Sequence, residues 1–252
     1  MRCRTALVAL LAALGMPSAA GAQDLVGKLP PRGEPGRVRG IAPTPERGAV
    51  TAKLLANTRV YRWSRLGRPI ATLPSQTRYT RSGTRLLVVG ARYGKDRRLR
   101  LKVVVPLRPT NRPAWIKADK VRLQENRWFV RIDRAARRVR VYRAGRLIRR
   151  FRAVVGAPGT PTPHGLAATY EEVTAADPTI FTGPWSLHLT AYSRVLDRFG
   201  AGDGRIAIHG RGPASLVDPL GTARSHGCVR TDNDRVRYLH RALPLGTPVR
   251  IS

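Results

Sequence analysis

Apolar and polar residues alternate along much of this chain, in short runs that end at glycine and proline turns. In the first half, runs rich in β-branched and other apolar residues cover 58–61, 86–89, 99–105 and 114–116. Turn signals such as Ser82-Gly83 separate these runs. Several short strands in so short a length predict a small barrel over residues 49–123.

A second β-rich region begins at Trp128. Apolar residues alternate with polar, mostly basic ones over 129–133 and 139–142, and a turn at Ala144-Gly145 leads into 147–155. This pattern predicts an antiparallel hairpin or meander with one buried face. Its many arginines fall mostly on the polar phase of the alternation, which indicates a solvated face, with contact to an anionic polymer as the alternative.

Few segments of the chain favour a helix. Residues 156–163 are rich in glycine and proline and predict a loop, because proline cannot occupy the interior of a sheet. The best helical segment is 233–241, and Asp232 before it is a candidate N-cap. The second region is therefore expected to be mostly β, with one or two short helices.

The N-terminus has the composition of a secretory signal. Arg2 and Arg4 precede an apolar run over 6–16, and small residues follow in an A-x-A arrangement. We expect residues 1–22 to be a cleaved signal peptide, which leaves no stable membrane span, and 23–48 to be an extended linker rich in proline and glycine. The mature protein is then exported across the cytoplasmic membrane to the cell wall or periplasm.

The charge is strongly positive: 47 Lys plus Arg against 15 Asp plus Glu give a formal net charge of +32 over 252 residues. A composition that is 42% hydrophobic is typical of a folded protein and excludes a disordered basic tail as a description of the whole chain. Such a charge attracts polyanions. Export excludes nucleic acid as the partner, so we expect anionic cell-wall polymers, with compositional background as the alternative.

Only Cys228 remains once the signal peptide is removed, so the mature protein has a free thiol that needs an explanation. Its sequence context is Ser225-His226-Gly227-Cys228-Val229-Arg230. Arg230 favours a thiolate, and Gly227 permits a sharp bend that aims backbone N–H groups at an oxyanion. A nucleophile, its activator and its oxyanion donors can thus come from one turn. The alternative is a buried, inert cysteine.

A base for this thiol is available from two histidines. Residues 206–209 alternate like a strand that ends at His209, which is well placed as a general base, while His226 lies two residues before Cys228. We favour His209. A three-ligand zinc site made of His209, His226 and Cys228 is a further alternative. His164, His188 and His240 stand in no motif and are expected to be surface or packing residues.

These motifs resemble the signature of the L,D-transpeptidase catalytic domain of the YkuD type. The match consists of His209-Gly210, an intervening loop and the 225–230 motif, and it extends upstream to Ile132-Asp133 and downstream to 245–249, over roughly the last 125 residues. Residues 49–123 resemble bacterial SH3-like domains more loosely, most clearly at Trp115 to Ala118.

The resemblance implies a mainly β protein in which an SH3-like small barrel precedes a YkuD-type β-sandwich catalytic domain at 126–252. It also implies a reaction. Cys228 attacks the carbonyl that joins the third residue of a peptidoglycan stem tetrapeptide to D-Ala, D-Ala departs, and a thioester forms. An amine on another stem then resolves the thioester and makes a 3→3 cross-link. No cofactor and no metal are expected, and the chain is expected to be a monomer.

The family's functional residues carry over onto matching positions. Cys228 is the nucleophile and His209 the proton acceptor and donor. The backbone N–H groups of Gly227 and Cys228 fall at the oxyanion hole. Further matching positions are the supporting residues Ser225, His226 and Arg230, and Tyr192 near the same pocket.

Two other classes of function are alternatives to a transpeptidase. One is a hydrolytic enzyme, either an L,D-carboxypeptidase or a cysteine peptidase of the wall-hydrolase kind; such peptidases place Cys before His in the chain, the reverse of His209 and Cys228. The other is a non-catalytic wall-binding protein. The intact pair of Cys and His favours an enzyme.

Overall fold

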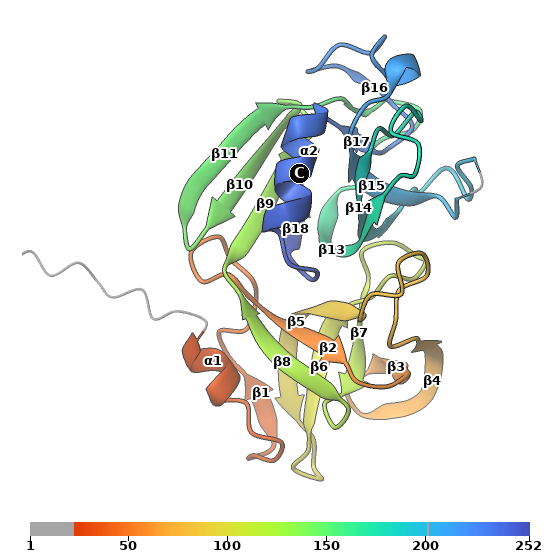
Figure 1. The fold of residues 1–252 in the computed structure, drawn as a ribbon. Helices are drawn as coiled ribbons and strands as arrows, with labels where there is room; N and C mark the ends of the chain where they lie inside the picture. Colours follow the sequence, from red (N-terminus) through yellow and green to blue (C-terminus); the bar gives the residue numbers. More distant parts are fainter. Residues whose placement is uncertain (1–22, 201) are drawn as a thin grey trace, which may run out of the picture.

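The structure is a computed structural model that describes residues 23–200 and 202–252. The predicted signal peptide, residues 1–22, lies outside the described residues. Within them, strands dominate and are arranged in two large sheets, one above the other in Figure 1. The mainly β fold expected from the alternation is confirmed. No helix in the described part of the chain is long and apolar enough to cross a membrane.

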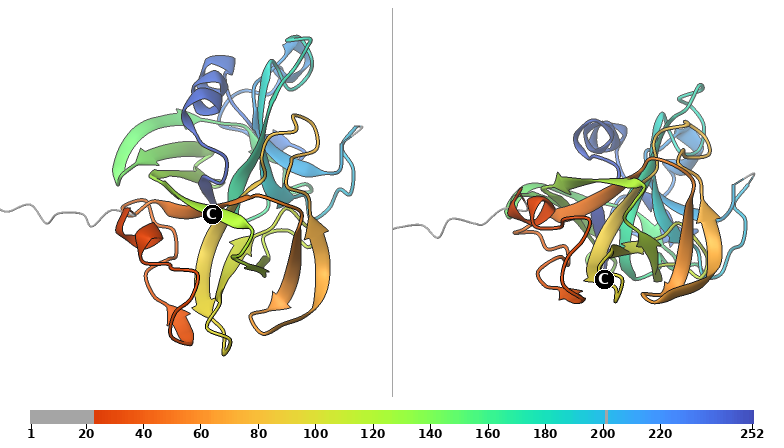
Figure 2. Two further views of the ribbon diagram at one scale, coloured as in Figure 1. Left: turned by 60° about the horizontal axis from the view of Figure 1, so that its bottom comes forward. Right: turned by 90° about the horizontal axis from the view of Figure 1, so that it is seen from below.

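The first sheet is antiparallel throughout and has the order β4-β3-β7-β6-β5-β2-β8, with β1 paired to β5. Seen from below in Figure 2, its strands curve around their own interior. Every second side chain points inward, so the apolar residues form one core. The strands are β1 (Gly36–Val38), β2 (Ala49–Leu54), β3 (Thr58–Trp63), β4 (Leu66–Leu73), β5 (Arg85–Tyr93), β6 (Leu99–Val104), β7 (Pro113–Lys117) and β8 (Val121–Asn126).

The second sheet has the order β11-β10-β9-β18-β13-β14-β15-β17, and two of its neighbouring pairs, β9 with β18 and β15 with β17, are parallel. A separate two-stranded sheet pairs β12 (Val155–Gly156) with β16 (Ala223–Ser225). The strands of the second sheet are β9 (Trp128–Asp133), β10 (Arg138–Arg143), β11 (Arg146–Arg152), β13 (Gly165–Thr174), β14 (Trp185–Tyr192), β15 (Arg205–His209), β17 (Val229–Arg230) and β18 (Pro248–Ile251).

The meander expected after Trp128 is present as β9, β10 and β11. Val139 and Val141 are fully buried while the arginines between them and around them face outward or lie half-buried. Ala144 and Gly145 both have positive φ, 48° and 81°, which suits the tight turn between β10 and β11. The run expected over 147–155 is not one strand, because β11 ends at Arg152 and the chain then forms an isolated bridge from Val154 to Arg230 before it pairs again at β12.

Two α-helices and a short 3-10 helix (Pro213–Ser215) complete the described elements. α1 (Gln23–Gly27) precedes the first sheet, and α2 (Asn233–Ala242) packs on β14 and β15 through Val236 and Leu239. The helix predicted at 233–241 is therefore confirmed. Asp232 occupies the N-cap position, but its carboxylate accepts a hydrogen bond from Arg211 (2.9 Å) and makes none to the helix.

Residues 23–48 differ from the extended linker expected for them. Leu29 and Ile41 are buried in the core of the first sheet, and β1 pairs with β5. The hydroxyl of Tyr93 donates to the carbonyl of Pro30 (3.0 Å), and the backbone of this segment also bonds the chain near Arg97. Proline has no backbone N–H to donate, so it is tolerated at the edge of a sheet, where no neighbouring strand needs that donor. Apolar contacts, strand pairing and hydrogen bonds together hold the segment on the sheet.

The two sheets are joined by a small shared core. Leu87 and Val104 of the first sheet pack with Ala168 of the second, and the buried amide of Asn126 donates to the hydroxyl of Thr247 (2.9 Å). Two loops of the first sheet also reach the second sheet beside β13 and β14. The domain boundaries and the SH3-like character of the first sheet remain predictions.

Candidate active site

The parallel pairing of β15 with β17 places the candidate nucleophile and base on one face of the sheet. Ile208 lies opposite Val229, and both are buried in the core below. Because successive side chains alternate between faces, His209 and the residues on either side of Val229 lie on the other face. Cys228 and His209 are thereby brought to the same surface from positions 19 residues apart.

The Cys228 thiol is half-buried against β15. Its Sγ accepts a hydrogen bond from the backbone N–H of Ala207 (3.4 Å) and lies 3.9 Å from the carbonyl oxygen of Arg205. Burial raises the pKa of Cys228, and the Ala207 N–H and the Arg230 charge only partly offset it. Arg230 favours the thiolate, as expected from the sequence, but loss of solvent outweighs the cation and the net shift of the pKa is upward.

His209 is 2% exposed, and its Nδ1 lies 2.7 Å from the carbonyl oxygen of Gly210. Burial lowers the pKa of His209 to about 4, and the nearby Arg230 adds to the effect. The ring is therefore neutral at physiological pH and available to accept a proton. The described residues contain no hydrogen bond between this imidazole and the thiol, a common situation before substrate binds.

The turn before Cys228 is closed by Ser225. Its hydroxyl donates to the carbonyl of Cys228 (2.5 Å) and accepts from the N–H of Gly227 (3.1 Å). Gly227 has φ +116°, and an added Cβ would lie 3.1 Å from Ile206 Cδ1, so the position requires glycine. Ser225 thus sets the shape of the turn, and the Gly227 amide assigned to the oxyanion hole is engaged by Ser225 in this state.

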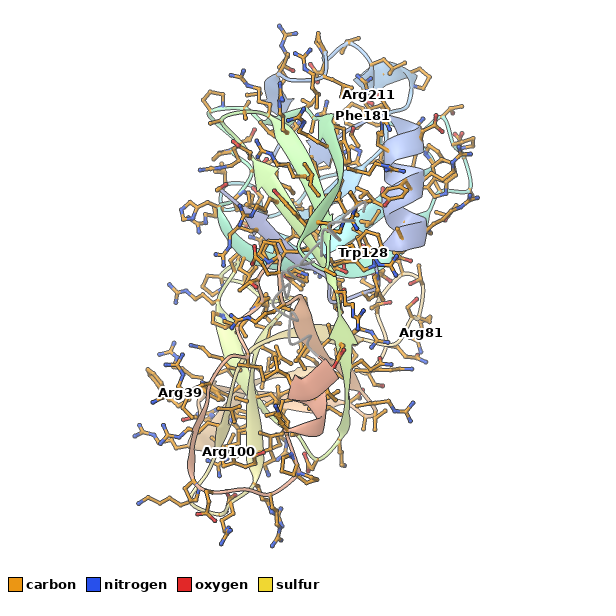
Figure 3. The ribbon with its side chains drawn as sticks, turned by 90° about the vertical axis from the view of Figure 1, so that its left-hand side faces the viewer. Arg39, Arg81, Arg100, Trp128, Phe181 and Arg211 are labelled. Carbon is orange, nitrogen blue, oxygen red and sulfur yellow. The ribbon has the colours of Figure 1, made fainter. Side chains whose placement is uncertain are left out.

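Arg230 is 2% exposed and holds the loop that precedes the turn. Its Nη1 donates to Asp218 (2.6 Å), and its guanidinium lies over the ring of Phe181 at 4.6 Å. Phe181 lies at the upper end of the molecule in Figure 3. Sequence reasoning missed Asp218 and Phe181, because neither belongs to a motif and both come from loops distant in the chain.

His226 does not join this cluster. It is exposed, and its ring packs against Phe199 with centroids 5.3 Å apart. The preference for His209 over His226 as the base stays a prediction. Within residues 23–200 and 202–252, no three His, Cys, Asp or Glu side chains lie close enough together to hold a metal ion. The arrangement of these residues does not favour the three-ligand zinc alternative.

Tyr192, at the end of β14, is committed to contacts with Pro106 and Arg205. Its hydroxyl bonds the carbonyl of Pro106 (3.1 Å) and the guanidinium of Arg205, which stacks on the ring at 4.4 Å. Burial raises the pKa of Tyr192 to about 12. The carbonyl of the same Arg205 faces the Cys228 thiol. Tyr192 therefore supports β15, the strand behind the nucleophile. Arg205 was missed by sequence reasoning because it belongs to no motif.

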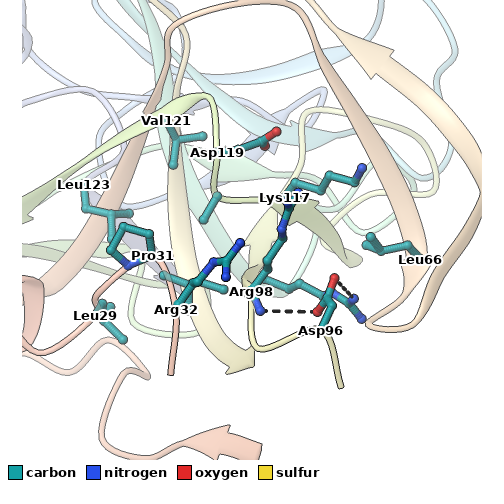
Figure 4. A pocket seen from close by; sticks show the side chains of 13 residues that line it. Leu29, Pro31, Arg32, Leu66, Asp96, Arg98, Lys117, Asp119, Val121 and Leu123 are labelled. Carbon is teal, nitrogen blue, oxygen red and sulfur yellow. Dashed lines mark hydrogen bonds and ion pairs between the residues drawn. The ribbon is translucent and has the colours of Figure 1, made fainter. Parts of the chain in front are cut away.

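A separate pocket of about 490 Å³ lies in the first sheet. Figure 4 shows its basic side chains, among them Arg32, Arg98 and Lys117, beside the carboxylate of Asp96 and an apolar floor. None of the residues around Cys228 lines it. It is therefore not part of the candidate active site.

Comparison with protein families decides the class of the second sheet. Residues 127–251 match the model of the L,D-transpeptidase catalytic domain, YkuD. Residues 127–251 are an L,D-transpeptidase catalytic domain. The expected identity and enzyme class of this region are confirmed, and the matched region contains every candidate site residue.

No curated protein was found to match this chain. Among solved structures, an L,D-transpeptidase mutant of Enterococcus faecium is similar at 20% identity, with 51% of this chain and 50% of that chain covered and a TM-score of 0.36. The L,D-transpeptidase from Mycobacterium smegmatis is 16% identical, with 61% of this chain and 90% of that chain covered and a TM-score of 0.38. The L,D-transpeptidase from Stackebrandtia nassauensis is 17% identical, with 51% of this chain and 56% of that chain covered and a TM-score of 0.36. The chain spans half the length of the Enterococcus faecium structure.

The buried pair of Arg230 and Asp218 yields a stability prediction for the transpeptidase domain. Asp218→Ala leaves a guanidinium that is 2% exposed without its carboxylate, so we expect the free energy of unfolding to fall by about 3–5 kcal/mol in urea denaturation. The matched control is Asp234→Ala, which removes the exposed partner of Arg237 and should cost less than about 1 kcal/mol. Equal effects of the two substitutions would contradict the buried pair's role.

The pKa of His209 predicts a pH dependence of the transpeptidase domain's stability. The unfolded chain binds a proton between pH 6.5, the ordinary value, and about 4, while folded His209 stays neutral. The contribution of neutral His209 to stability is complete above the pKa that His209 has in the unfolded chain. It is lost as the pH falls toward the pKa that His209 has in the folded chain. We expect a loss of up to about 1.4 kcal/mol per pH unit in that window. In urea unfolding at pH 7 and pH 5, the free energy of unfolding of His209→Gln should change less with pH than that of the wild type. An equal change in the two proteins would contradict the lowered pKa of His209.

Proposed function

We propose that this chain is an exported cysteine L,D-transpeptidase that acts on peptidoglycan stem peptides. The observation that carries the proposal is the pairing of β15 with β17, which places Cys228 and His209 on one face of an L,D-transpeptidase catalytic domain. The predicted signal peptide supports export to the cell wall or periplasm.

The first half of the reaction transfers the stem to the enzyme. His209 takes the proton of the Cys228 thiol as the sulfur attacks the carbonyl between the third stem residue and D-Ala. The C–N bond breaks, His209 gives the proton to the leaving amine of D-Ala, and a thioester remains on Cys228. Because the thiol's pKa is raised and that of His209 is lowered, the resting pair is neutral, so this proton transfer accompanies the attack.

The second half reverses these roles. The amine of a neighbouring stem attacks the thioester, His209 accepts the amine's proton, and Cys228 leaves as a thiol after the proton returns to it. The product is a 3→3 cross-link. Backbone N–H groups at the Gly227 turn are the donors proposed for the oxyanion in both halves. Substrate in the site would compete with Ser225 for the Gly227 amide.

Substitution of the nucleophile tests the proposed function. We expect Cys228→Ala to abolish release of D-Ala from a synthetic tetrapeptide stem, because no thioester can form. His209→Gln should lower the rate by 10²-fold or more, as expected for loss of a general base. His240→Gln, on α2, is the matched histidine control and should retain activity.

Mass spectrometry after exposure to a carbapenem gives an independent readout. A covalent adduct should form on the wild-type chain and be absent from Cys228→Ala. Turnover unchanged in Cys228→Ala would refute the cysteine mechanism. Release of D-Ala with tripeptide stems as the only further product would assign the chain to the hydrolytic class, since water and not an amine would then resolve the thioester.

We further propose that the positive charge retains the protein at anionic wall polymers. Exposed arginines are spread over the first sheet, where Arg39 and Arg81 point away from the ribbon in Figure 3. The pocket of Figure 4 adds four basic residues against two acidic ones. Such attraction is screened by salt. This makes a membrane anchor unnecessary for retention.

Salt elution tests this retention. Protein bound to isolated cell walls at low ionic strength should be released when NaCl is raised to about 1 M, where screening acts within about 3 Å. A variant with Arg37, Arg39 and Arg68 replaced by Gln should elute at lower salt, because all three are exposed. If the salt concentration does not affect binding, the arginine excess is compositional background.

A further inference from the structure

A loop of the first sheet is fixed to the catalytic sheet by one buried carboxylate. The loop, residues 74–84 between β4 and β5, presents the N–H groups of Tyr79 and Thr80 and the hydroxyl of Thr80 to Glu171 Oε1, at 2.7, 2.7 and 3.1 Å. Glu171 lies on β13 and is 1% exposed. Hydrogen bonds to a carboxylate are stronger than neutral ones. The first sheet is therefore attached to the catalytic sheet at a defined point.

The loop also holds its own shape. The N–H of Thr77 donates to the carbonyl of Ser82, and the N–H of Thr84 donates to that of Ser75, each at 2.8 Å. The hydroxyl of Thr80 lies 3.0 Å from that of Ser82. A loop closed by internal bonds pays little conformational entropy when a ligand touches it. It is suited to be a fixed wall rather than a mobile lid.

The point of attachment lies in line with the nucleophile. Glu171 is opposite His188 on β14, and His188 is opposite Ala207 on β15. The register of β15 with β17 places Cys228 beside Ala207, whose N–H bonds the thiol. Residues opposite each other share a face. Glu171, His188, Ala207 and Cys228 thus form one row across the catalytic face.

Tyr79 stands above this row. Its ring meets the ring of His188 edge-on, with centroids 5.5 Å apart, and the Arg78 guanidinium lies 5.6 Å from the Tyr79 ring. Tyr79 keeps 47% of its surface exposed, so its ring is accessible to a ligand. Among the residues that the structure describes, the buried Nδ1 of His188 has no hydrogen-bond partner, a feature that packing alone does not explain.

The dimensions match those of a stem peptide. Neighbouring strands lie about 4.8 Å apart, so His188 is about 10 Å from Cys228 across β15. Three extended residues span about 10 Å. A stem whose third residue is attached to Cys228 can therefore reach Tyr79 with its first residues. Arg78 and Arg81, both exposed on the loop, suit the carboxylates of such a peptide.

We propose that the 74–84 loop forms one wall of the groove for the acyl-donor stem, with Tyr79 as the contact and with His188 and Glu171 as the residues that position it. The ligand is an extended, carboxylate-bearing peptide. This inference rests on the proposed function and adds to it that the first sheet takes part in substrate binding. Sequence reasoning assigned no role to Tyr79 or Glu171, and His188 was expected to be a surface or packing residue.

Kinetics of D-Ala release from a synthetic tetrapeptide stem test the proposal. We expect Tyr79→Ala to lower kcat/KM about tenfold, mainly through KM, since an aromatic contact of this kind is worth about one such factor. Tyr79→Phe should restore most of the activity. Trp63→Ala removes an aromatic residue that is 57% exposed on β3 and serves as the matched control, with no change expected.

A second variant and a second measurement separate binding from misfolding. Glu171→Ala should reduce kcat/KM as Tyr79→Ala does, and the double variant should lose little more, because both act through the same loop. Alkylation of Cys228 by iodoacetamide, which is too small to need the groove, should stay within twofold of wild type in all variants.

Wild-type kcat/KM in Tyr79→Ala would overturn the proposal, and so would an equal loss of alkylation and D-Ala release, which would indicate a disturbed nucleophile. Failure of the wild-type chain itself to release D-Ala would instead refute the proposed function, and this inference with it.

Discussion

The register of β15 against β17 is the constraint on which the candidate site depends. Ile208 and Val229 are opposite each other and buried, so neither strand can slip by one residue without exposing its core side chain. The same register turns His209 and Cys228 to the opposite face. Burial of Ile208 and Val229 on one face of the sheet thus sets the positions of Cys228 and His209 on the other face. These positions do not depend on a hydrogen bond between the thiol and the imidazole.

Burial at this face has an electrostatic consequence. It raises the pKa of Cys228 and lowers that of His209, so both groups rest in their neutral forms. Arg230 only partly offsets the effect of burial on the pKa of Cys228, and it adds to the lowering of the pKa of His209. A neutral pair is less reactive than a thiolate toward adventitious oxidants and alkylating agents. Attack then depends on a proton acceptor held at the same surface.

Loops of the first sheet make hydrogen bonds to the catalytic domain. Arg108, from a loop of that sheet, donates to backbone carbonyls of Ser193 and Leu196 in the catalytic domain. In turn, Glu171 of the catalytic domain accepts hydrogen bonds from the 74–84 loop of the first sheet. The shared apolar core between the sheets lies beneath these contacts. The loops around the catalytic face are thus shaped by both sheets, although the family match covers only the second.

The sequence by itself determined the strand-rich class, the meander after Trp128, the helix α2 and the two motifs that contain His209 and Cys228. Each of these depends on local periodicity or on neighbouring residues. Only the tertiary structure decided the sign of the Cys228 pKa shift, the burial of Arg230 on Asp218 and the row from Glu171 to Cys228. These depend on loss of solvent and on contacts between residues far apart in the chain, such as Tyr79 and His188, which no local pattern encodes. The packing of residues 23–48 on the first sheet was missed for the same reason: a few apolar side chains among prolines acquire a partner only once the sheet exists.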